Sequence, residues 1–153
     1  MKSLEERFWA KVEKTEGCWN WTGSKTYGYG AISVGGRAGR PHAAHRISYE
    51  FANGEIPAGV DIDHKCHNRA CVNPSHLQAV SRKANLENPD PAQFSKPRGV
   101  YWHKGAKKWT VSVSHHNRSV YGGLFSDLDE AIARSIELRN SLYTNNLADR
   151  KMA

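Results

Sequence analysis

Apolar side chains recur with helical and strand-like spacings along the first half of the chain. Leu4, Phe8 and Val12 stand four residues apart, which places them on one stripe of a short amphipathic helix over residues 3–13. The next segment, CWNWTGSKTYGYGAISVGG, is rich in aromatic residues, Gly and Thr, and predicts a β-hairpin or a pair of short strands. Residues 43–52, AAHRISYEFA, predict a second helix, which the following Asn-Gly pair ends.

A strand, a loop and a third helical segment precede a stretch rich in proline. Val60 and Ile62 favour a strand that runs into a polar loop, and Pro74 then opens the helix-like segment PSHLQAVSRKANLEN. The stretch LENPDPAQFSKP holds three prolines, which resist helix formation and favour an extended spacer. We therefore place one domain at residues 1–88 and a linker at residues 89–97.

Beyond the linker, a strand pattern gives way to a helical pattern. From Trp109 to Val113 the apolar residues alternate with Thr and Ser, as in a half-buried strand. Ser126 and Asp129 have the spacing of a capping box, with Asp in place of Glu, at the start of a helix of about four turns. The apolar face of this helix holds Leu128, Ile132, Ile136 and Leu142. Three strands and one packed helix then form a second domain at 98–146, followed by a tail at 147–153.

The composition is that of a small globular protein, and the mixture of elements predicts the α+β class. A chain of 153 residues can form one ordinary domain, or two small domains whose cores are thin. No apolar run approaches the roughly 20 residues of a membrane-spanning helix, and the N-terminus lacks the apolar core of a signal peptide. We therefore expect a cytoplasmic protein that has no membrane partner.

The positive charge is concentrated in two stretches of the chain. The formal net charge is +7. Residues 17–49 contain four Lys or Arg and no acid, and residues 91–126 contain six and again no acid. Such stretches suit a polyanion, because each cation placed on a phosphate releases condensed counterions. The alternative is a solvated basic surface that binds nothing; the clustering favours nucleic acid.

The three cysteines and one histidine have the spacing of a metal site. An odd number of cysteines without an export signal argues against a disulfide framework. Cys66, Cys71 and His76 follow a C-x4-C-x4-H pattern, and Cys18 would complete the four ligands that zinc prefers. A closed site of this kind is structural and would add folding energy to a small core. The alternative is three buried cysteines that bind no metal.

The motifs CWNWTG, YGYG, AHRISYE and DHKCHNRACVNPSHL, followed by Asn85, resemble the HNH (ββα-metal) endonuclease family. The resemblance covers residues 8–88 and points to the branch that is common in phage and intron-borne genes, which includes homing endonucleases. It implies a zinc-tied ββα-metal core that hydrolyses phosphodiester bonds in DNA, in a bacterial or phage-infected cell.

The family resemblance also implies a role for each residue of the motif. His64 would be the general base that takes a proton from the attacking water. Asp63 and Asn85 would hold one divalent cation, usually magnesium, with manganese as an alternative. Asn73 would brace the loop that orients the His64 ring. His76 could serve either metal, and its spacing to Cys71 favours zinc.

The same residues suit phosphodiester hydrolysis on chemical grounds. A histidine that titrates near neutral pH can accept a proton, and a hard cation on oxygen ligands can neutralise the charge on the phosphate. Asp63 and His64 are adjacent, so both can reach one site only at the end or a distortion of a strand. The alternative is that Asp63 and His64 are a surface pair and Asn85 an exposed helix residue. Arg46, in the preceding helix, is equally suited to a phosphate contact and to a structural role.

The motifs RGVYW, KKW, YGGLF and DEAIAR are similar to the Apetala-type (ethylene-response-factor) DNA-binding domain. This second resemblance covers residues 98–143 and implies a three-stranded antiparallel sheet in the major groove, with a helix on its back. Tyr101 stands where the plant family usually has Arg, so the base preference stays open. The residues that we expect to face DNA are Arg98, Trp102, Lys104, Lys107, Lys108 and Arg118.

Together these features predict a metal-dependent endonuclease that nicks or cuts duplex DNA. A rival function is a zinc-stabilised protein that binds DNA without cutting it, although Asp63, His64 and Asn85 would then have no purpose. A nuclease that acts on RNA is a third possibility, which a groove-reading sheet disfavours. The sequence leaves open the target site, a monomeric or dimeric state, and a role in homing, restriction or phage DNA processing.

Overall fold

The computed structural model describes residues 2–35 and 39–150, and the chain divides into two compact units, residues 1–85 and 86–153. The mixture of helices and small antiparallel sheets confirms the predicted α+β class. No helix within the described ranges is long and apolar enough to cross a membrane.

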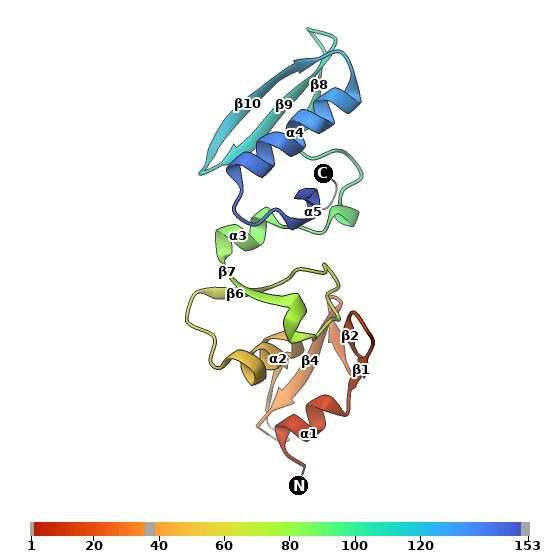
Figure 1. Ribbon diagram of the computed structural model, residues 1–153, viewed down its shortest axis with the longest axis vertical. Coiled ribbons are helices and arrows are strands. Elements are labelled where there is room, and N and C mark those ends of the chain that lie inside the picture. Colours follow the sequence, from red (N-terminus) through yellow and green to blue (C-terminus); the bar gives the residue numbers. More distant parts are fainter. Residues whose placement is uncertain (1, 36–38, 151–153) are drawn as a thin grey trace. The chain divides into compact units, whose positions relative to one another are not determined.

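The first unit combines three short antiparallel sheets with small helices. Its elements are α1 (Leu4–Trp9), β1 (Val12–Lys14), β2 (Trp19–Trp21), β3 (Lys25–Thr26), β4 (Tyr29–Val34), β5 (Arg40–Ala43), α2 (Ala44–Asn53), β6 (Val60–His64), the 3-10 helix η2 (Pro74–His76) and β7 (Leu77–Ser81) (Figure 1). The boundary between the units falls within the next helix, α3 (Arg82–Glu87). β1 pairs with β2, β4 lies between β3 and β5, and β6 pairs with β7.

The first helix is shorter than its apolar stripe predicts. Ser3 and Glu6 form a capping box at its start, and the helix ends at Trp9. Val12, the third apolar residue of the stripe, instead pairs with Trp21 between β1 and β2. Pairing with a neighbouring strand therefore overrides the local helical pattern.

The core of the first unit gathers around Trp21, which is 1% exposed. The buried cluster consists of Phe8, Trp21, Ile32, Ala44, Ile47 and Val72. Gly30 of β4 lies directly against this indole, since a Cβ at position 30 would be 2.6 Å from Trp21 Cγ. The cluster joins α1, β2, β4 and α2 to the loop after β6, which carries most of the candidate site.

The segment after Pro74 differs from the predicted continuous helix. It forms η2, then strand β7, then α3. β7 pairs in register with β6, from Val60 opposite Ser81 to His64 opposite Leu77. Leu77 is buried with Ile62 in a small separate cluster, so burial and pairing stabilise a strand there.

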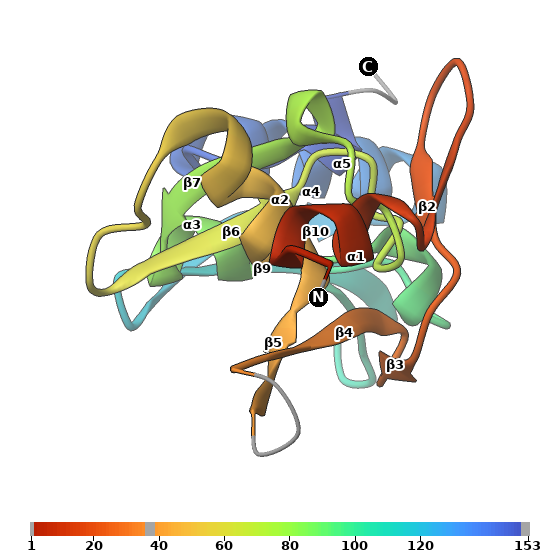
Figure 2. The ribbon, with the colours of Figure 1, turned by 90° about the horizontal axis from the view of Figure 1, so that it is seen from below.

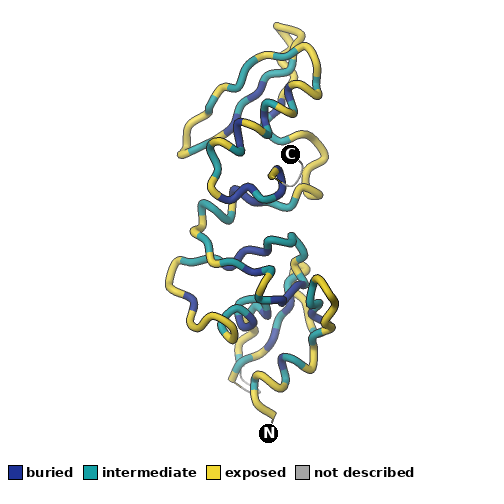
Figure 3. Tube along the Cα trace, in the orientation of Figure 1, coloured by how far each residue is buried: buried dark blue, intermediate teal, exposed yellow. Residues whose placement is uncertain are grey.

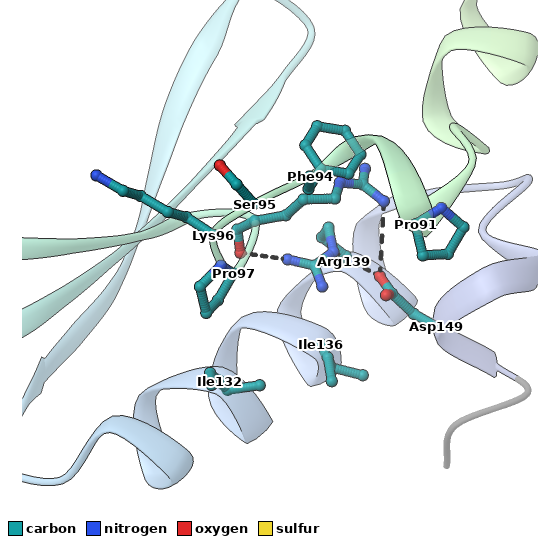
Figure 4. Close-up of a pocket in the computed structure, with 10 residues that line it drawn as sticks. Pro91, Phe94, Ser95, Lys96, Pro97, Ile132, Ile136, Arg139 and Asp149 are labelled. Carbon is teal, nitrogen blue, oxygen red and sulfur yellow. Dashed lines mark hydrogen bonds and ion pairs between the residues drawn. The ribbon is translucent and has the colours of Figure 1, made fainter.

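The predicted linker at residues 89–97 is folded as part of the second unit. Asp90 caps a 3-10 helix, η3 (Pro91–Gln93). Asn88 Oδ1 accepts a hydrogen bond from the backbone N–H of Leu147 at 3.1 Å. A cavity of about 290 Å³ lies between residues 91–98 and the long helix of this unit (Figure 4). Residues 91–97 are exposed, so the prolines shape an ordered surface segment that contains a 3-10 turn, not an extended spacer.

The second unit is a three-stranded antiparallel sheet with a helix across one face (Figure 1). Its regular elements after η3 are β8 (Val100–His103), β9 (Lys108–His115), β10 (Arg118–Phe125), α4 (Leu128–Leu142) and α5 (Leu147–Arg150). α4 begins one residue later than predicted, because Asp127, not Ser126, accepts the capping hydrogen bond. Four residues of the predicted tail form α5. Buried positions lie along β9 and the inner side of α4, as Figure 3 shows.

Candidate nuclease centre

Three cysteines and one histidine meet in the first unit. The ligand atoms of Cys18, Cys66, Cys71 and His76 all lie within 4.8 Å of one another. The distances from His76 Nδ1 to the sulfur atoms of Cys18 and Cys71 are 3.6 and 3.7 Å. Tetrahedral zinc at its usual bond lengths sets nitrogen and sulfur about 3.6 Å apart. The donor set and its spacing therefore fit one zinc ion.

The cysteine environment favours a thiolate in this cluster. A hydrogen bond from Cys71 lowers the pKa of the Cys66 thiol to about 4, and the same interaction raises the pKa of Cys71. Zinc binds cysteine as thiolate, so one ligand of the four is already prepared for metal.

Backbone pairing brings Cys18 to the loop that holds the other three ligands. Val72 N donates to Trp19 O, and Trp21 N donates to Ala70 O, both at 2.8 Å. Asn73 adds a side-chain tie, because its Nδ2 donates to Gly17 O at 2.8 Å. Its Oδ1 also caps η2. Such contacts suit the brace that we expect of Asn73, and its effect on His64 stays a prediction.

His64 is the last residue of β6 and lies at the edge of this loop. Its side chain is nearly enclosed, and its Nε2 lies 3.0 Å from Cys71 O. Because a carbonyl oxygen can only accept, Nε2 carries the proton and Nδ1 has the free lone pair. Burial lowers the pKa of His64, although the hydrogen bond to Cys71 opposes that shift. The ring is therefore neutral near neutral pH.

The His64 ring packs against two other aromatic rings. The ring of His45 in α2 has its centroid 4.7 Å away, and that of Tyr29 in β4 is 5.8 Å away. Burial, with a smaller contribution from His64, lowers the pKa of His45 to about 3. The AHR motif was the signal for this helix, but sequence alone did not indicate that His45 touches His64.

Arg46 makes a structural contact. Its Nη1 donates to Val60 O at 3.3 Å, which ties α2 to the start of β6. Of the two roles predicted for Arg46, a phosphate contact or a structural contact, this hydrogen bond is of the structural kind.

Asp63 and Asn85, the expected cation ligands, have separate hydrogen-bond partners. Asp63 is 7% exposed and accepts a hydrogen bond from Gln78 Nε2 at 3.0 Å. Asn85 Nδ2 donates to Asp61 Oδ2 at 2.9 Å. Asp61 stands two residues before Asp63 on β6, so the two carboxylates share one face of the strand.

Asp61 was missed in the sequence, although the D-x-D-H alternation was its signal. Arg82 also pairs with Asp61, at 3.1 Å. The hydrogen bond from Asn85 lowers the pKa of Asp61. With its nitrogen held by Asp61, Asn85 has its amide oxygen free to face another ligand.

Residues 42–87, which include α2, β6, the metal-site loop and α3, match the model of the HNH endonuclease family. The chain belongs to this family. HNH proteins of the family are nucleases, so the match gives a nuclease-type function on DNA at the family level.

The relatives of this HNH protein are phage proteins. It is 38% identical to protein 7.7 of Escherichia phage T7 over 98 residues, which are 63% of this chain and 70% of that protein. It is 31% identical to T7 protein 2.8 over 54% of this chain and 56% of that protein. It is also 43% identical to the uncharacterized gene 5.3 protein of Enterobacteria phage T3, over 28% of this chain and 42% of that protein. No solved structure matches the HNH protein.

Arg98 of the HNH protein does not face outward from the second unit, as we had expected. Only 18% of its side chain is exposed, and its Nη1 lies 4.0 Å from Asp149 Oδ2. Its guanidinium also lies over the Phe94 ring, 5.4 Å from the centroid. Its backbone oxygen accepts a hydrogen bond from Arg139 Nη1 at 2.7 Å. Arg98 therefore belongs to the packing of this unit.

The other expected DNA contacts lie at the two ends of the sheet. Trp102 does not lie on the face opposite the helix, as we had expected. It is 49% exposed, and its ring packs edge-on against Trp109 on the side of the sheet that carries α4. The turn between β8 and β9 and the start of β10 carry the exposed cations Lys104, Lys107, Lys108 and Arg118. The opposite face of the sheet presents Tyr101 and Tyr121, which are 59% and 64% exposed.

Proposed function

We propose that this HNH protein is a metal-dependent endonuclease that nicks or cuts duplex DNA. The observation that carries the proposal is the His64 imidazole. Its Nε2 contacts the backbone oxygen of Cys71, which is itself one of the four clustered cysteine and histidine residues. A DNA-binding protein without chemistry would not need a histidine whose tautomer is fixed in this way.

His64 acts as the general base in this proposal. The Cys71 carbonyl keeps the proton on Nε2, so Nδ1 takes the proton from the attacking water. The packing of His45 and Tyr29 keeps the ring from turning. Neutrality at physiological pH leaves the base ready before substrate binds.

Asp63 and Asn85 supply the oxygen ligands for one magnesium or manganese ion. Asp61 contributes as a positioning residue, because it holds the Asn85 nitrogen and leaves the amide oxygen for the cation. A bound cation would act as a Lewis acid on the phosphate and the departing oxygen.

The cluster of Cys18, Cys66, Cys71 and His76 binds one structural zinc in this proposal. With four protein ligands the site is closed, so zinc has no position for a substrate. His76 therefore serves zinc and not the catalytic cation. Metal analysis of the purified protein should give about one zinc per chain; a protein that folds fully without zinc would remove this part.

The second unit acts as a DNA-binding domain of the Apetala type. Cations at both ends of the sheet, with tyrosines between them, suit contacts to phosphates on either side of a groove. We place the protein on DNA in the phage-infected bacterial cell.

Incubation with supercoiled plasmid and magnesium tests the proposed cleavage. We expect nicked or linear DNA, no cleavage with EDTA, and loss of cleavage in His64→Ala with duplex binding retained. The matched control is His42→Ala, an exposed histidine in the same unit, which should cut like the parent. If His64→Ala cuts equally well, the base is misassigned. If the parent binds DNA but never cuts, the non-catalytic rival is correct.

A further inference from the structure

A basic concavity in the first unit is lined by residues that the proposed nuclease centre does not use. Its volume is about 500 Å³, and it lies between α1 and the β3–β4–β5 sheet. In Figure 2, α1 is seen beside β4. None of its ten lining residues is acidic. The polar side chains around it are those of Lys2, Arg7, Lys11, Ser24, Thr26 and Ser33.

Two of the three cations are held in place by packing. Arg7 Nη1 donates to Ser33 O at 3.4 Å, across the concavity from α1 to β4. Lys11 runs over Gly23, where a Cβ would lie 3.0 Å from its Cδ. Phe8, between them in the chain, is fully buried and anchors the helix. Arg7, Lys11 and Lys2 therefore all line one concavity, and two of them also contact its rim.

The acids of α1 are not among the residues that line the concavity. Glu6 accepts the capping hydrogen bond from Ser3 N, and Glu5 accepts from Trp9 Nε1. Among the described residues, none of the three cations takes part in an ion pair. Unneutralised cations beside hydroxyl groups form a site for phosphate oxygens.

Strand β4 connects this concavity to the nuclease centre. Tyr29 at its start touches the His64 ring, and Ser33 near its end lines the concavity. Four residues of strand span about 13 Å at roughly 3.3 Å each. Phosphates of one DNA strand advance about 3.4 Å along the axis per step. One duplex can therefore reach both places.

We propose that this concavity binds backbone phosphates of the DNA a few nucleotides from the bond that is cut. The inference rests on the proposed function, since it assumes that DNA lies at His64. In this inference the N-terminal segment helps to hold the DNA substrate. The cysteine and histidine motifs do not assign that segment a role.

The test is the salt dependence of duplex binding by the full chain, measured by fluorescence anisotropy in EDTA. In the double variant Arg7→Gln/Lys11→Gln, two phosphate contacts are lost. Between roughly 50 and 200 mM salt the parent should lose about tenfold more affinity than this variant. The control, Lys14→Gln/Arg134→Gln, removes equal charge outside the concavity and should behave like the parent. A second variant, Lys2→Gln/Lys11→Gln, spares the Arg7 tie to β4 in case its loss unfolds the unit.

The outcomes separate this inference from the proposed function. If both concavity variants keep the parent's salt dependence while the parent binds DNA, the concavity is not a phosphate site and the nuclease proposal stands. If both the concavity and control variants lose salt dependence equally, the effect is one of net charge and the inference is wrong. If the parent binds no duplex at all, both proposals fail.

Discussion

At the scale of single residues, the orientation of Asn85 depends on an acid outside the predicted motif. Asp61 accepts from Asn85 Nδ2, so the amide cannot rotate without losing a hydrogen bond. In the proposed cation site, this contact would let the asparagine on α3 present its oxygen rather than its nitrogen to the cation. The exposed Arg82 also pairs with Asp61.

We expect Asp61→Ala to weaken the proposed cation site. Without its partner the Asn85 amide is free to rotate, and the loss of such a supporting residue typically costs roughly 10- to 100-fold in metal affinity. The magnesium concentration for half-maximal cleavage should rise accordingly, with little change in the rate at saturating magnesium. Glu55→Ala, an exposed acid in the same unit, is the control. An unchanged magnesium titration in Asp61→Ala would show that Asn85 does not depend on Asp61.

We expect Gly30→Ala to destabilise the first unit. Its new Cβ would overlap the buried Trp21 ring at 2.6 Å, and overpacking of this kind costs about 1–3 kcal/mol in the free energy of unfolding. Gly17 has no atom within 4 Å of its Cβ position, so Gly17→Ala is the matched control. Urea denaturation followed by tryptophan fluorescence measures both variants. Equal midpoints in the two would show that the core around Trp21 is loose.

At the scale of elements, the second unit has a buried ion pair that joins α4 to α5. Arg139 and Asp149 are 5% and 6% exposed, and Arg139 Nε donates to Asp149 Oδ2. Burial raises the pKa of Asp149, but the hydrogen bonds from Arg139 and Asn146 outweigh it and place the pKa below its ordinary value. The ionised form is therefore more stable folded than unfolded.

This pair predicts a loss of stability in acid. A carboxyl whose folded pKa is depressed stabilises the fold above its unfolded pKa, about 3.9, and that contribution is lost as pH falls through the folded value. Asp149→Asn should therefore lower the thermal midpoint at neutral pH, and the difference from the parent should shrink below about pH 4. Asp129→Asn, on the exposed side of α4, is the control. A difference that stays constant with pH would mean that the charge of Asp149 contributes nothing.

The sequence analysis was wrong where the secondary structure or exposure of a residue depends on a partner from another element. Val12 belongs to a helical stripe locally, yet it pairs with Trp21. Leu77–Ser81 became a strand because β6 lies beside it. Arg98 looked like an exposed cation until Asp149, 51 positions later in the sequence, approached it. By contrast, the strand at Trp109 and the helix α4 follow from local periodicity, which needs no partner to be read.

The sequence predicted those residues of the candidate centre whose spacing is typical of a metal site. The structure brings together the four residues that the cysteine spacing singled out. The contacts of Asp61 and His45 could not be read, since each depends on which face of β6 or α2 turns toward the loop. The sequence spacing therefore predicts the metal ligands, whereas the residues that contact them are known only once the strands and helices are placed.

At the scale of the whole molecule, binding and chemistry are assigned to different residues. The proposed base and cation ligands, His64, Asp63 and Asn85, lie within residues 42–87, whereas the exposed cations Lys104, Lys107, Lys108 and Arg118 belong to the sheet of the second unit. Cations on phosphates set affinity and its salt dependence, while the imidazole and the cation set the rate of cleavage. Removing the sheet cations should therefore change affinity without changing the chemical step.

Replacement of all four sheet cations by Gln tests this separation. Each phosphate contact contributes about 0.9 to the slope of log affinity against log salt. Between roughly 50 and 200 mM salt, the parent should therefore lose about 100-fold more affinity than the variant that lacks four contacts. The cleavage rate at saturating DNA should stay near the parent value, since His64 and Asp63 are untouched. A control that replaces Lys14, Lys96, Arg134 and Arg150 by Gln matches the change in net charge. If the sheet variant cuts far more slowly than this control even at saturating DNA, the sheet positions the DNA for cleavage and the two tasks are not separate.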